Sequence, residues 1–434
     1  MISADSLTDT SRRNTWWLTI FLTLCFTLSY TDRHVLSLLI EPVKASLHLS
    51  DTQMGLAQGL SFSIFYVLAS LPLGRLSDGG HRPRIISTCI AVWCLMTMLC
   101  GFVSNFWQLL LARVGVASSE AGLPPAALTM MADLNDPEHL ASRTSVFMLA
   151  PFLGGGLALM GGGALYGAIQ HWGPVSVGSF ATLEPWRLVF VLVGAPGLLA
   201  AAAVLLLLRE PRADAGTAPK GFSFAPLLAF LRGDAVFNSF YMLTMAMLVI
   251  LLNANVSWMP AVLMRAHHVD ARTVGLLFGP VFLVFGIIGT LAAGAIIGRS
   301  KESVVNRTFR FMRWCVLIAL PAAALGPLAP SLWLKLPLVA VTLLCTSSGL
   351  ALSSLPLLII APSEVRAQAL AVLALVTALV GTGLGPLLVG VLSDLLRGAN
   401  QPLSVALAIV GATAALFAAL MLHSLVRRSR EHHR

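Results

Sequence analysis

The sequence is poor in charge: only 11% of its 434 residues are Asp, Glu, Lys or Arg, whereas 57% are hydrophobic. Water-soluble domains carry about 25% charged residues, so the composition excludes an ordinary soluble protein. The apolar residues form runs of about 20, long enough to cross a bilayer. Lipid offers no hydrogen-bond partner to the backbone, and the runs do not alternate in polarity, so the sequence predicts an all-α membrane protein.

Several motifs are also missing. The six cysteines lie in hydrophobic segments without CxxC or Cys/His spacing, so we expect packing residues and no metal site or cofactor. No GxxxxGK[ST] loop occurs, which argues against ATP as an energy source. The net charge of +9 comes from basic residues in short loops, a distribution that argues against nucleic acid as a partner. Residues 1–15 carry no cleavable signal pattern, so the first span is expected to act as the signal.

Twelve apolar runs are candidate membrane-spanning helices, at a rise of about 1.5 Å per residue. They divide into two sets of six around a small, polar stretch. We expect an N-terminal six-helix bundle at 1–208, a cytoplasmic linker at 209–235 and a C-terminal six-helix bundle at 236–434. A short interfacial helix over 222–232 is expected within the linker. The expected spans are 16–39, 53–76, 84–103, 106–133, 142–168, 187–208, 236–262, 273–298, 311–329, 332–359, 367–393 and 402–425.

The two halves repeat. A shift of 220 residues superimposes three glycines and three apolar residues of the second span on identical residues of the eighth. One such match would be noise in an apolar sequence, but six in register indicate duplication. Parallel repeats around a central site are a known plan for transporters. The matched pairs are Gly55 and Gly275, Gly59 and Gly279, Gly74 and Gly294, Leu56 and Leu276, Phe62 and Phe282, and Phe65 and Phe285.

Basic residues concentrate on one side of the expected spans, which is the cytoplasmic side by the positive-inside rule. With an even number of spans both termini share that side, so we expect a multi-pass protein of the inner (plasma) membrane with both termini cytoplasmic. The opposite loops hold only Lys44, Arg187, Arg265, Arg272, Lys335 and Arg397. The cytoplasmic set is Arg12, Arg13, Arg75, Arg82, Arg84, Arg299, Lys301, Arg307, Arg310, Arg313, Arg427, Arg428 and Arg430.

Four charged residues lie inside otherwise apolar spans: Asp32 and Arg33 in the first, Arg113 and Glu120 in the fourth. A charge at the bilayer centre costs at least about 2.5–3.5 kcal/mol, so such residues usually face an interior and serve a function. Helix rise places Asp32 and Arg113 at similar depth, with Glu120 on the same face as Arg113. The four are expected to form one inward-facing cluster if these two spans are neighbours.

This cluster has two interpretations. It could be a set of buried ion pairs that fixes helix packing, although desolvation offsets much of the attraction in such pairs. Alternatively, it could be a proton relay or a substrate anchor. A carboxylate that gains and loses its arginine partner as a cavity opens would bind and release a proton. We favour the second interpretation, which predicts proton-coupled secondary active transport by alternating access.

The loop after the second span is expected to control conformation. Gly74 would permit close helix approach, and Asp78 would cap a helix start or pair with an arginine across the interface between the halves. Arg82 and Arg84 would hold the loop in the cytoplasm. A solvated loop is the simpler interpretation. The segment reads Gly74-Arg75-Leu76-Ser77-Asp78-Gly79-Gly80-His81-Arg82-Pro83-Arg84.

Further short motifs accompany this loop. They are Tyr30-Thr31-Asp32-Arg33, Glu41-Pro42-Val43-Lys44, Leu49-Ser50-Asp51-Thr52-Gln53-Met54-Gly55-Leu56, Asn105-Phe106-Trp107-Gln108-Leu109, Ala112-Arg113-Val114-Gly115-Val116, Ser119-Glu120-Ala121 and Gly385-Pro386-Leu387-Leu388-Val389-Gly390-Val391-Leu392-Ser393-Asp394. The loop resembles the signature loop of the major facilitator superfamily, with departures at Gly79 and His81. The other stretches are similar to its Spinster-like branch. The resemblance implies two six-helix bundles, lipid-like cargo, and coupling or cavity roles for Asp32, Arg33, Arg113 and Glu120.

The ionisable residues of the second half all lie near span ends, so its cavity wall is expected to be apolar. Its polar candidates are Asn253 and Asn255, which could either hold helices together or line the cavity. A cavity with charge on one side only suits an amphiphile, with its head group near Arg33, Arg113 and Glu120.

The expected partners are a small-molecule or lipid-like substrate, protons and membrane lipids, with no nucleic acid, and the expected state is a monomer. Three alternatives remain open. One is a facilitator without proton coupling. The second is an organic-anion or sugar-acid:proton symporter of a neighbouring branch, which also has a Tyr-x-Asp-Arg first span. The third is a membrane-embedded enzyme or sensor, which would need a catalytic constellation that the sequence lacks, so we expect no enzyme.

Overall fold

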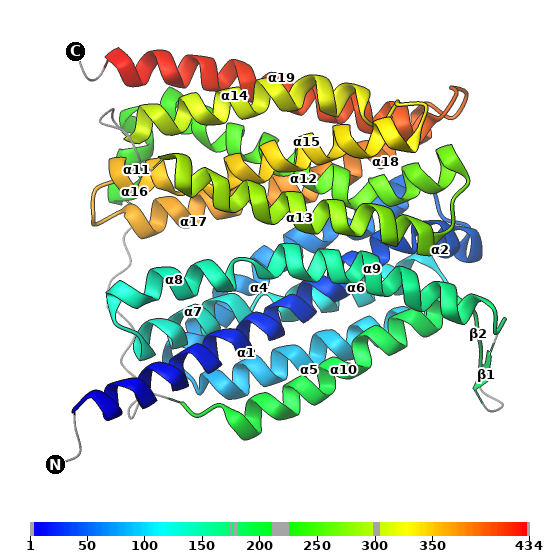
Figure 1. Ribbon diagram of the computed structural model, residues 1–434, viewed down its shortest axis with the longest axis horizontal. Helices are drawn as coiled ribbons and strands as arrows, with labels where there is room; N and C mark the ends of the chain where they lie inside the picture. Colours follow the sequence, from blue (N-terminus) through cyan, green and yellow to red (C-terminus); the bar gives the residue numbers. More distant parts are fainter. Residues whose placement is uncertain (1–3, 174, 178–180, 211–224, 298–303, 432–434) are drawn as a thin grey trace. The chain divides into compact units, whose positions relative to one another are not determined.

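The computed structural model describes residues 4–173, 175–177, 181–210, 225–297 and 304–431 (Figure 1). Within these ranges the fold is helical, as expected, apart from one short antiparallel hairpin that pairs Val175 with Leu183. The elements are α1 Ala4–Leu38, α2 Ile40–Leu47, α3 Asp51–Gln58, α4 Leu60–Gly79, α5 Arg82–Cys100, α6 Phe106–Glu120, α7 Leu123–Leu134, α8 Pro137–Phe147, α9 Ala150–Gln170, β1 Val175–Val177, β2 Ala181–Leu183, α10 Pro185–Leu207, α11 Ala225–Gly233, α12 Ala235–His267, α13 Ala271–Ile297, α14 Val304–Leu325, α15 Leu332–Ala351, α16 Leu355–Ile360, α17 Arg366–Val376, the π-helix η1 Thr377–Gly383, α18 Leu384–Leu395 and α19 Pro402–Glu431.

Ten helical segments of the described chain are long and apolar enough to cross a membrane. The two expected spans outside this set are those that carry the four charges: 16–39, which forms most of α1, and 106–133, which forms α6 and α7. A turn at Ala121-Gly122 follows Glu120 and separates α6 from α7. The ten segments are Asp51–Gly79, Arg82–Cys100, Ser142–Gln170, Pro185–Leu207, Ala235–His267, Ala271–Ile296, Val304–Leu325, Leu332–Ile360, Gln368–Leu395 and Pro402–Arg428.

Local sequence explains where several helices begin. Ser50 and Gln53 form a reciprocal capping box at the start of α3. The side chain of Asn105 accepts a hydrogen bond at 3.0 Å from the backbone N–H of Gln108 and caps α6. His81 caps α5, and a proline follows in the first turn, where its missing N–H leaves no bond unmade. These caps satisfy backbone N–H groups that have no partner within the helix.

The described chain packs into two units. Unit 1 consists of Met1–Leu36 and Phe65–Pro219, and unit 2 consists of Ser37–Ile64 and Lys220–Arg434. In unit 1, α5 packs along α10 and α6. The expected linker contains α11, whose neighbour Asn238 donates at 3.1 Å to the carbonyl oxygen of Phe230. Residues 211–224 of that linker lie outside the described ranges, and so does the start of the expected interfacial helix.

A glycine brings two helices of unit 1 into backbone contact. A Cβ atom at Gly154 of α9 would overlap the carbonyl oxygen of Thr27 and lie 2.5 Å from the Cβ of Tyr30, both on α1. The hydroxyl of Thr31 also donates to the carbonyl oxygen of Gly154 at 3.2 Å. Because only glycine fits here, this position fixes the part of α1 that precedes Asp32.

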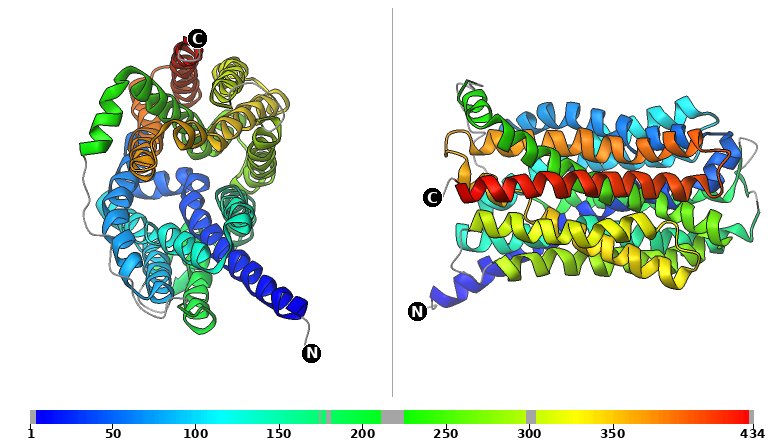
Figure 2. Two further views of the ribbon diagram at one scale, coloured as in Figure 1. Left: turned by 90° about the vertical axis from the view of Figure 1, so that its left-hand side faces the viewer. Right: turned by 90° about the horizontal axis from the view of Figure 1, so that it is seen from above.

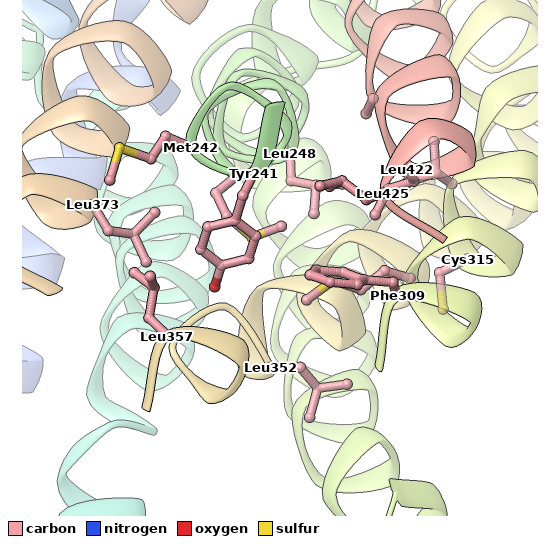
Figure 3. Close-up of a cluster of buried hydrophobic side chains, with 14 of the residues drawn as sticks. Tyr241, Met242, Leu248, Phe309, Cys315, Leu352, Leu357, Leu373, Leu422 and Leu425 are labelled. Atoms are coloured by element: carbon pink, nitrogen blue, oxygen red, sulfur yellow. The ribbon is translucent and has the colours of Figure 1, made fainter. Parts of the chain in front are cut away.

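In unit 2, α14 and α19 run side by side (Figures 1 and 2). Between the helices lies a hydrophobic cluster in which the rings of Tyr241 and Phe309 are 5.9 Å apart at 68° (Figure 3). This edge-to-face geometry is favourable for aromatic pairs. The hydroxyl of Tyr241 donates to the carbonyl oxygen of Ser353, so the buried ring leaves no unsatisfied donor.

The eleventh expected span contains a π-helix. Its wide turn η1 includes Gly381, where an added Cβ would lie 2.5 Å from the Cβ of Val249 on α12. The turn therefore presents a glycine to the neighbouring helix of unit 2. Single π-helical turns inside α-helices often occur at functional positions.

Candidate functional site

In unit 1 the structure brings α1 and α6 together through a partly buried ion pair, in which the side chain of Arg33 is 16% exposed and that of Glu120 is fully buried. Nη2 of Arg33 donates to Oε2 of Glu120 at 2.6 Å, and Nε donates to the same oxygen at 3.3 Å. Glu120, Arg113 and Asp32 are 1%, 1% and 2% exposed. Two charges so close in a dry environment are held by their mutual attraction and by the hydrogen bonds between them.

Asp32 contacts a third helix. Its Oδ2 accepts a hydrogen bond from the hydroxyl of Thr97 at 3.4 Å and a longer one from the thiol of Cys94 at 3.9 Å, both on α5. Arg113 acts electrostatically on Asp32 and Glu120 from α6. The two buried carboxyl groups thus have different surroundings, with a guanidinium hydrogen-bonded to Glu120 and neutral donors around Asp32.

Two tyrosines enclose the guanidinium of Arg33. Its central carbon lies 4.6 Å from the ring centre of Tyr30 and 5.4 Å from that of Tyr66. Such contacts stabilise a cation that has lost its water. The ring of His34 stacks on Tyr30 at 5.9 Å. Sequence reasoning did not assign Tyr66, which comes from α4, because no spacing in the sequence links it to Arg33.

The two carboxylate oxygens of Glu120 have different surroundings. Oε2 receives both bonds from Arg33, whereas Oε1 is buried without a hydrogen-bond partner among the described residues. A buried acceptor without a hydrogen bond destabilises the folded protein, and such groups in native structures usually have a functional explanation. Oε1 is available to take up a proton or to accept a hydrogen bond from a bound molecule.

The loop after the second expected span differs from its prediction in three respects. Helix α4 continues to Gly79, so Gly74 and Asp78 are helical. His81, not Asp78, caps the start of α5. A Cβ at Gly74 would meet open space, so the close approach expected there is not seen. The apolar run ends at Leu76, as expected, and the helix continues for three further residues to Gly79.

Arg82 is fully buried rather than solvated. Its backbone N–H donates to Oε2 of Glu210 at 2.7 Å, and its guanidinium donates to Oε1 of the same carboxylate and to Oδ2 of Asp133, the latter at 2.7 Å. The arginine therefore joins the start of α5 to the end of α7 and to the chain after α10. Arg84 is exposed. Sequence reasoning missed both acidic partners, although each one lies just beyond or at the end of an apolar run.

The two asparagines of α12 donate to their own helix. Nδ2 of Asn253 bonds the carbonyl oxygen of Val249 at 3.1 Å, and Nδ2 of Asn255 bonds that of Leu251 at 2.9 Å. These bonds do not join helices. A nearby residue that does join helices is Trp258, whose Nε1 donates to the carbonyl oxygen of Pro386 on α18.

Unit 2 also contains an apolar pocket of about 620 Å³ between α12, the eleventh span and α19. No residue of the expected site lines it. Among the described residues no group of three or more His, Cys, Asp or Glu could hold a metal ion. The pocket is lined by Met247, Ile250, Val380, Leu384, Leu388, Val391, Leu392, Leu395, Ile409, Val410, Thr413, Ala414, Phe417 and Met421.

Residues 22–386 match the family profile described as Major Facilitator Superfamily. The chain belongs to this superfamily. A relative called "MFS-type efflux pump", from Mycolicibacterium smegmatis, is 31% identical over 408 residues that cover 91% of this chain and 88% of the relative. Human "protein spinster homolog 1" is 27% identical and covers 87% of this chain and 73% of its own length.

Solved structures of the superfamily agree with this assignment. The crystal structure of a bacterial homologue of the human lysosomal transporter Spinster, in an inward-facing and unoccupied conformation, superimposes with a TM-score of 0.77. It is 26% identical and covers 95% of this chain and 97% of that one. The major facilitator fold and the Spinster-like resemblance expected from the sequence are thereby confirmed. The protein is a multi-pass membrane transporter and not an enzyme.

Proposed function

We propose that this transporter moves a small or amphiphilic organic substrate by alternating access and couples the movement to protons. The observation that carries the proposal is the ion pair of partly exposed Arg33 with buried Glu120. Asp32 precedes Arg33 in the chain, and one oxygen of Glu120 has no hydrogen-bond partner among the described residues. Membrane-embedded charges of this kind typically mark proton relays or substrate paths.

The chemistry follows from charge balance. Asp32, Arg33, Arg113 and Glu120 are together neutral, so a proton added at Glu120 leaves the group with one excess positive charge. Arg33 then lacks its counter-ion and can bind an anionic group of a substrate, with its aromatic neighbours still in place. Loss of the proton restores the pair and releases the anion. Binding of proton and anion would thus be linked.

Two features support an amphiphile over a compact hydrophilic molecule. Every deep charge that we assign to the site comes from unit 1, and the pocket in unit 2 is apolar. The similar proteins, an efflux pump and a homologue of a lysosomal transporter, are compatible with either kind of substrate. An organic-anion or sugar-acid:proton symporter and an uncoupled facilitator are the competing proposals.

The remaining parts of the site are proposed as supporting elements. Alternating access would use two halves, 1–208 and 236–434, joined by 209–235, in a monomer with both termini in the cytoplasm. Gly74, Asp78, Arg82 and Arg84 would influence the conformational change. Asn253 and Asn255 would line the substrate path.

The test uses purified protein in liposomes with a pH-sensitive dye inside. A panel of single-chain amphiphiles, organic acids and sugar acids is added with and without an imposed pH gradient. A substrate that moves protons with it, and that accumulates only when the gradient is present, supports the proposal. Uptake that equilibrates at the same level with or without the gradient identifies a facilitator. If short hydrophilic acids displace a bound ligand and single-chain amphiphiles do not, the proposal of an amphiphilic substrate is wrong.

A further inference from the structure

One segment of the first half packs with the second half of the sequence. Residues 37–64, which contain α2 and α3, belong to unit 2, whereas the chain before and after them belongs to unit 1. Within unit 2, α3 packs along α18, which in turn contacts α12. A cluster of charged and hydroxyl side chains joins these elements. We call Glu41, Lys44, Asp51, Thr52, Arg265, Ser393 and Asp394 the α3 cluster.

Asp51 is at the centre of the α3 cluster and is 4% exposed. The guanidinium of Arg265, from α12, binds it in the bidentate manner, with Nη1 at 2.8 Å from Oδ2 and Nη2 at 2.7 Å from Oδ1. Ser393 of α18 donates to Oδ2 at 2.7 Å, and Lys44 of α2 pairs with Oδ1. One carboxylate therefore receives bonds from three other helices.

A second carboxylate caps α3 from a distance. Oδ2 of Asp394, in the last turn of α18, accepts from the backbone N–H of Thr52 at 2.8 Å and from its hydroxyl at 2.6 Å. Its other oxygen accepts from the backbone N–H of Asp51 at 3.3 Å. The N-terminus of a helix carries partial positive charge, so this carboxylate is well placed electrostatically.

The backbones of α3 and α18 approach each other closely at two glycines. A Cβ at Gly55 would lie 2.6 Å from the carbonyl oxygen of Pro386, and a Cβ at Gly390 would overlap the carbonyl oxygen of Asp51. Trp258 donates to the other side of this contact, at 2.8 Å from the carbonyl oxygen of Pro386. Glycine has no side chain, so helices that meet at glycines can separate and meet again there without a change of rotamer. The α3 cluster then determines the specific arrangement of α3 against α18.

Water can reach part of the α3 cluster. The side chains of Glu41 and Arg265 are 32% and 28% exposed, and Nε of Arg265 donates to Oε1 of Glu41 at 2.9 Å. Partly hydrated ion pairs contribute little net stability because water replaces the bonds that are lost. Their geometry is nevertheless demanding, since a bidentate pair forms in one arrangement only. The exposed pair of Glu41 and Arg265 is therefore inexpensive to open, whereas the pair of Arg265 with buried Asp51 makes the closed arrangement specific.

We propose that Asp51, Arg265 and Asp394 form a latch that holds residues 37–64 against α12 and α18 and opens once in each transport cycle. This inference rests on the proposed alternating access, in which the two halves of the sequence part at one end. Residues 37–64 belong to the first half, and α12 and α18 belong to the second. Parting at this end breaks every bond of the latch.

The experiment measures opening directly in the full-length protein in lipid nanodiscs. Spin labels are attached to cysteines at Ala45 of α2 and Asn400 beyond α18, both exposed, while the six native cysteines are buried. Pulsed electron paramagnetic resonance then gives the distribution of distances between the labels. We expect a short-distance population in the otherwise unaltered chain. Asp51→Asn should raise the ratio of long to short distances about tenfold or more, since it removes a charge-assisted bidentate bond.

Two matched variants test whether the effect is specific. Asp270→Asn makes the same change at an exposed acid that caps only α13, where Oδ1 accepts from the N–H of Thr273 at 3.0 Å, and should leave the distribution unchanged. Arg265→Lys keeps the charge but loses the bidentate geometry, so an intermediate shift is expected. Equal shifts in Asp51→Asn and Asp270→Asn, or no shift in either, would overturn the proposal.

A cross-link provides an independent measurement in case a variant folds poorly. Cysteines at Thr52 and Asp394 should form a disulfide when the protein is oxidised before the spin labels are added, and the long-distance population should then vanish. An oxidised protein that still shows long distances contradicts the latch. The readout uses neither substrate nor a pH gradient, so failure of the latch and failure of proton-coupled transport give different results.

Discussion

Asp32 and Glu120 are both buried carboxyl groups, yet their neighbours give them different tasks. Glu120 is hydrogen-bonded to Arg33 and keeps one oxygen unpartnered, whereas Asp32 accepts weak bonds from Thr97 and Cys94. The proposed mechanism places the proton on the carboxylate whose ion pair with an arginine breaks when it is protonated. Glu120 is that group, and Asp32 supplies negative charge beside Arg113.

We expect Asp32→Asn and Glu120→Gln each to abolish substrate accumulation driven by a pH gradient. The Glu120 change removes the group proposed to carry the proton, and the Asp32 change removes the negative charge proposed to balance Arg113. At least one of them should still exchange substrate across the membrane, since binding and proton coupling are separate steps. The measurement is uptake into liposomes with the gradient, compared with exchange between equal pools without it. Normal accumulation in both variants would disprove the relay.

Arg82 is buried and joins parts of unit 1, so we expect it to stabilise the fold instead of lying in a solvated loop. Arg82→Lys should lower the free energy of unfolding by roughly 1–3 kcal/mol, because a lysine has fewer donors and lacks the planar guanidinium that bonds Glu210 and Asp133. Thermal unfolding can be followed with a dye that reacts with the buried cysteines as they become exposed. Arg84→Lys, at an exposed residue two positions away, is the control and should leave the midpoint unchanged.

At the residue scale the sequence reveals charges that are out of place but not their partners. Asp32 and Glu120 stand out because apolar residues surround them in the sequence. Thr97 and Tyr66 do not, because polar or aromatic residues are common in membrane helices and their role depends on packing. Lys335 was also misjudged: it lies near a span end yet is 1% exposed, with Nζ donating at 3.0 Å to the carbonyl oxygen of Pro327.

At the scale of elements, the contact of α9 with α1 positions the charged part of α1. Gly154→Ala should destabilise the protein by roughly 1–3 kcal/mol, because the new methyl group would overlap the backbone at Thr27. Gly161→Ala is the control on the same helix, where a Cβ would meet open space. Alanine is a better helix former, so this change should be neutral or slightly stabilising.

Thermal unfolding of both variants tests this prediction, with gradient-driven uptake as a second readout. The displaced α1 should weaken transport in Gly154→Ala and leave it intact in Gly161→Ala. Equal stability of the two variants would show that α9 and α1 can separate at no cost.

The positions of the helices were largely predictable, because long apolar runs can only be buried or placed in lipid. Local breaks were not predicted. The turn after Glu120 has a local cause that the prediction of one continuous span overlooked: Gly122 precedes α7 and Pro124 lies in its first turn. The π-helix at Thr377–Gly383 was not expected from the sequence. Helix α14 begins at Val304 instead of 311, because several basic residues in its first turns hid its start from a search for apolar runs.

At the scale of the whole molecule, the distribution of basic residues predicts which side each loop faces. A cysteine at Gly79, which is exposed, should react with a membrane-impermeant thiol reagent only from the cytoplasm. A cysteine at Asn400 should react only from the opposite side. Labelling of intact and of permeabilised cells compares the two, and the six buried native cysteines keep the background low. The reverse pattern would invert the proposed topology.

The family was readable from short motifs, whereas the packing of residues 37–64 was not. The internal repeat suggested a division into two equal halves, since duplicated sequences tend to fold alike. The structure assigns this segment to unit 2 through Asp51 and Asp394, residues that are far apart in the sequence. Such pairs carry no periodic signal, and a single sequence cannot reveal that they touch.

The capping of α3 by Asp394 also has a consequence for biosynthesis. The two partners are separated by 343 residues, so α3 leaves the ribosome long before its cap exists. At about 5–20 residues per second the delay is roughly 20–70 s. During that time the first-turn amides of Asp51 and Thr52 must rely on water, because the side chains of Ser50 and Gln53 bond the amides of Gln53 and Ser50. The nascent first half is therefore exposed to chaperones and proteases at this corner until translation is nearly complete.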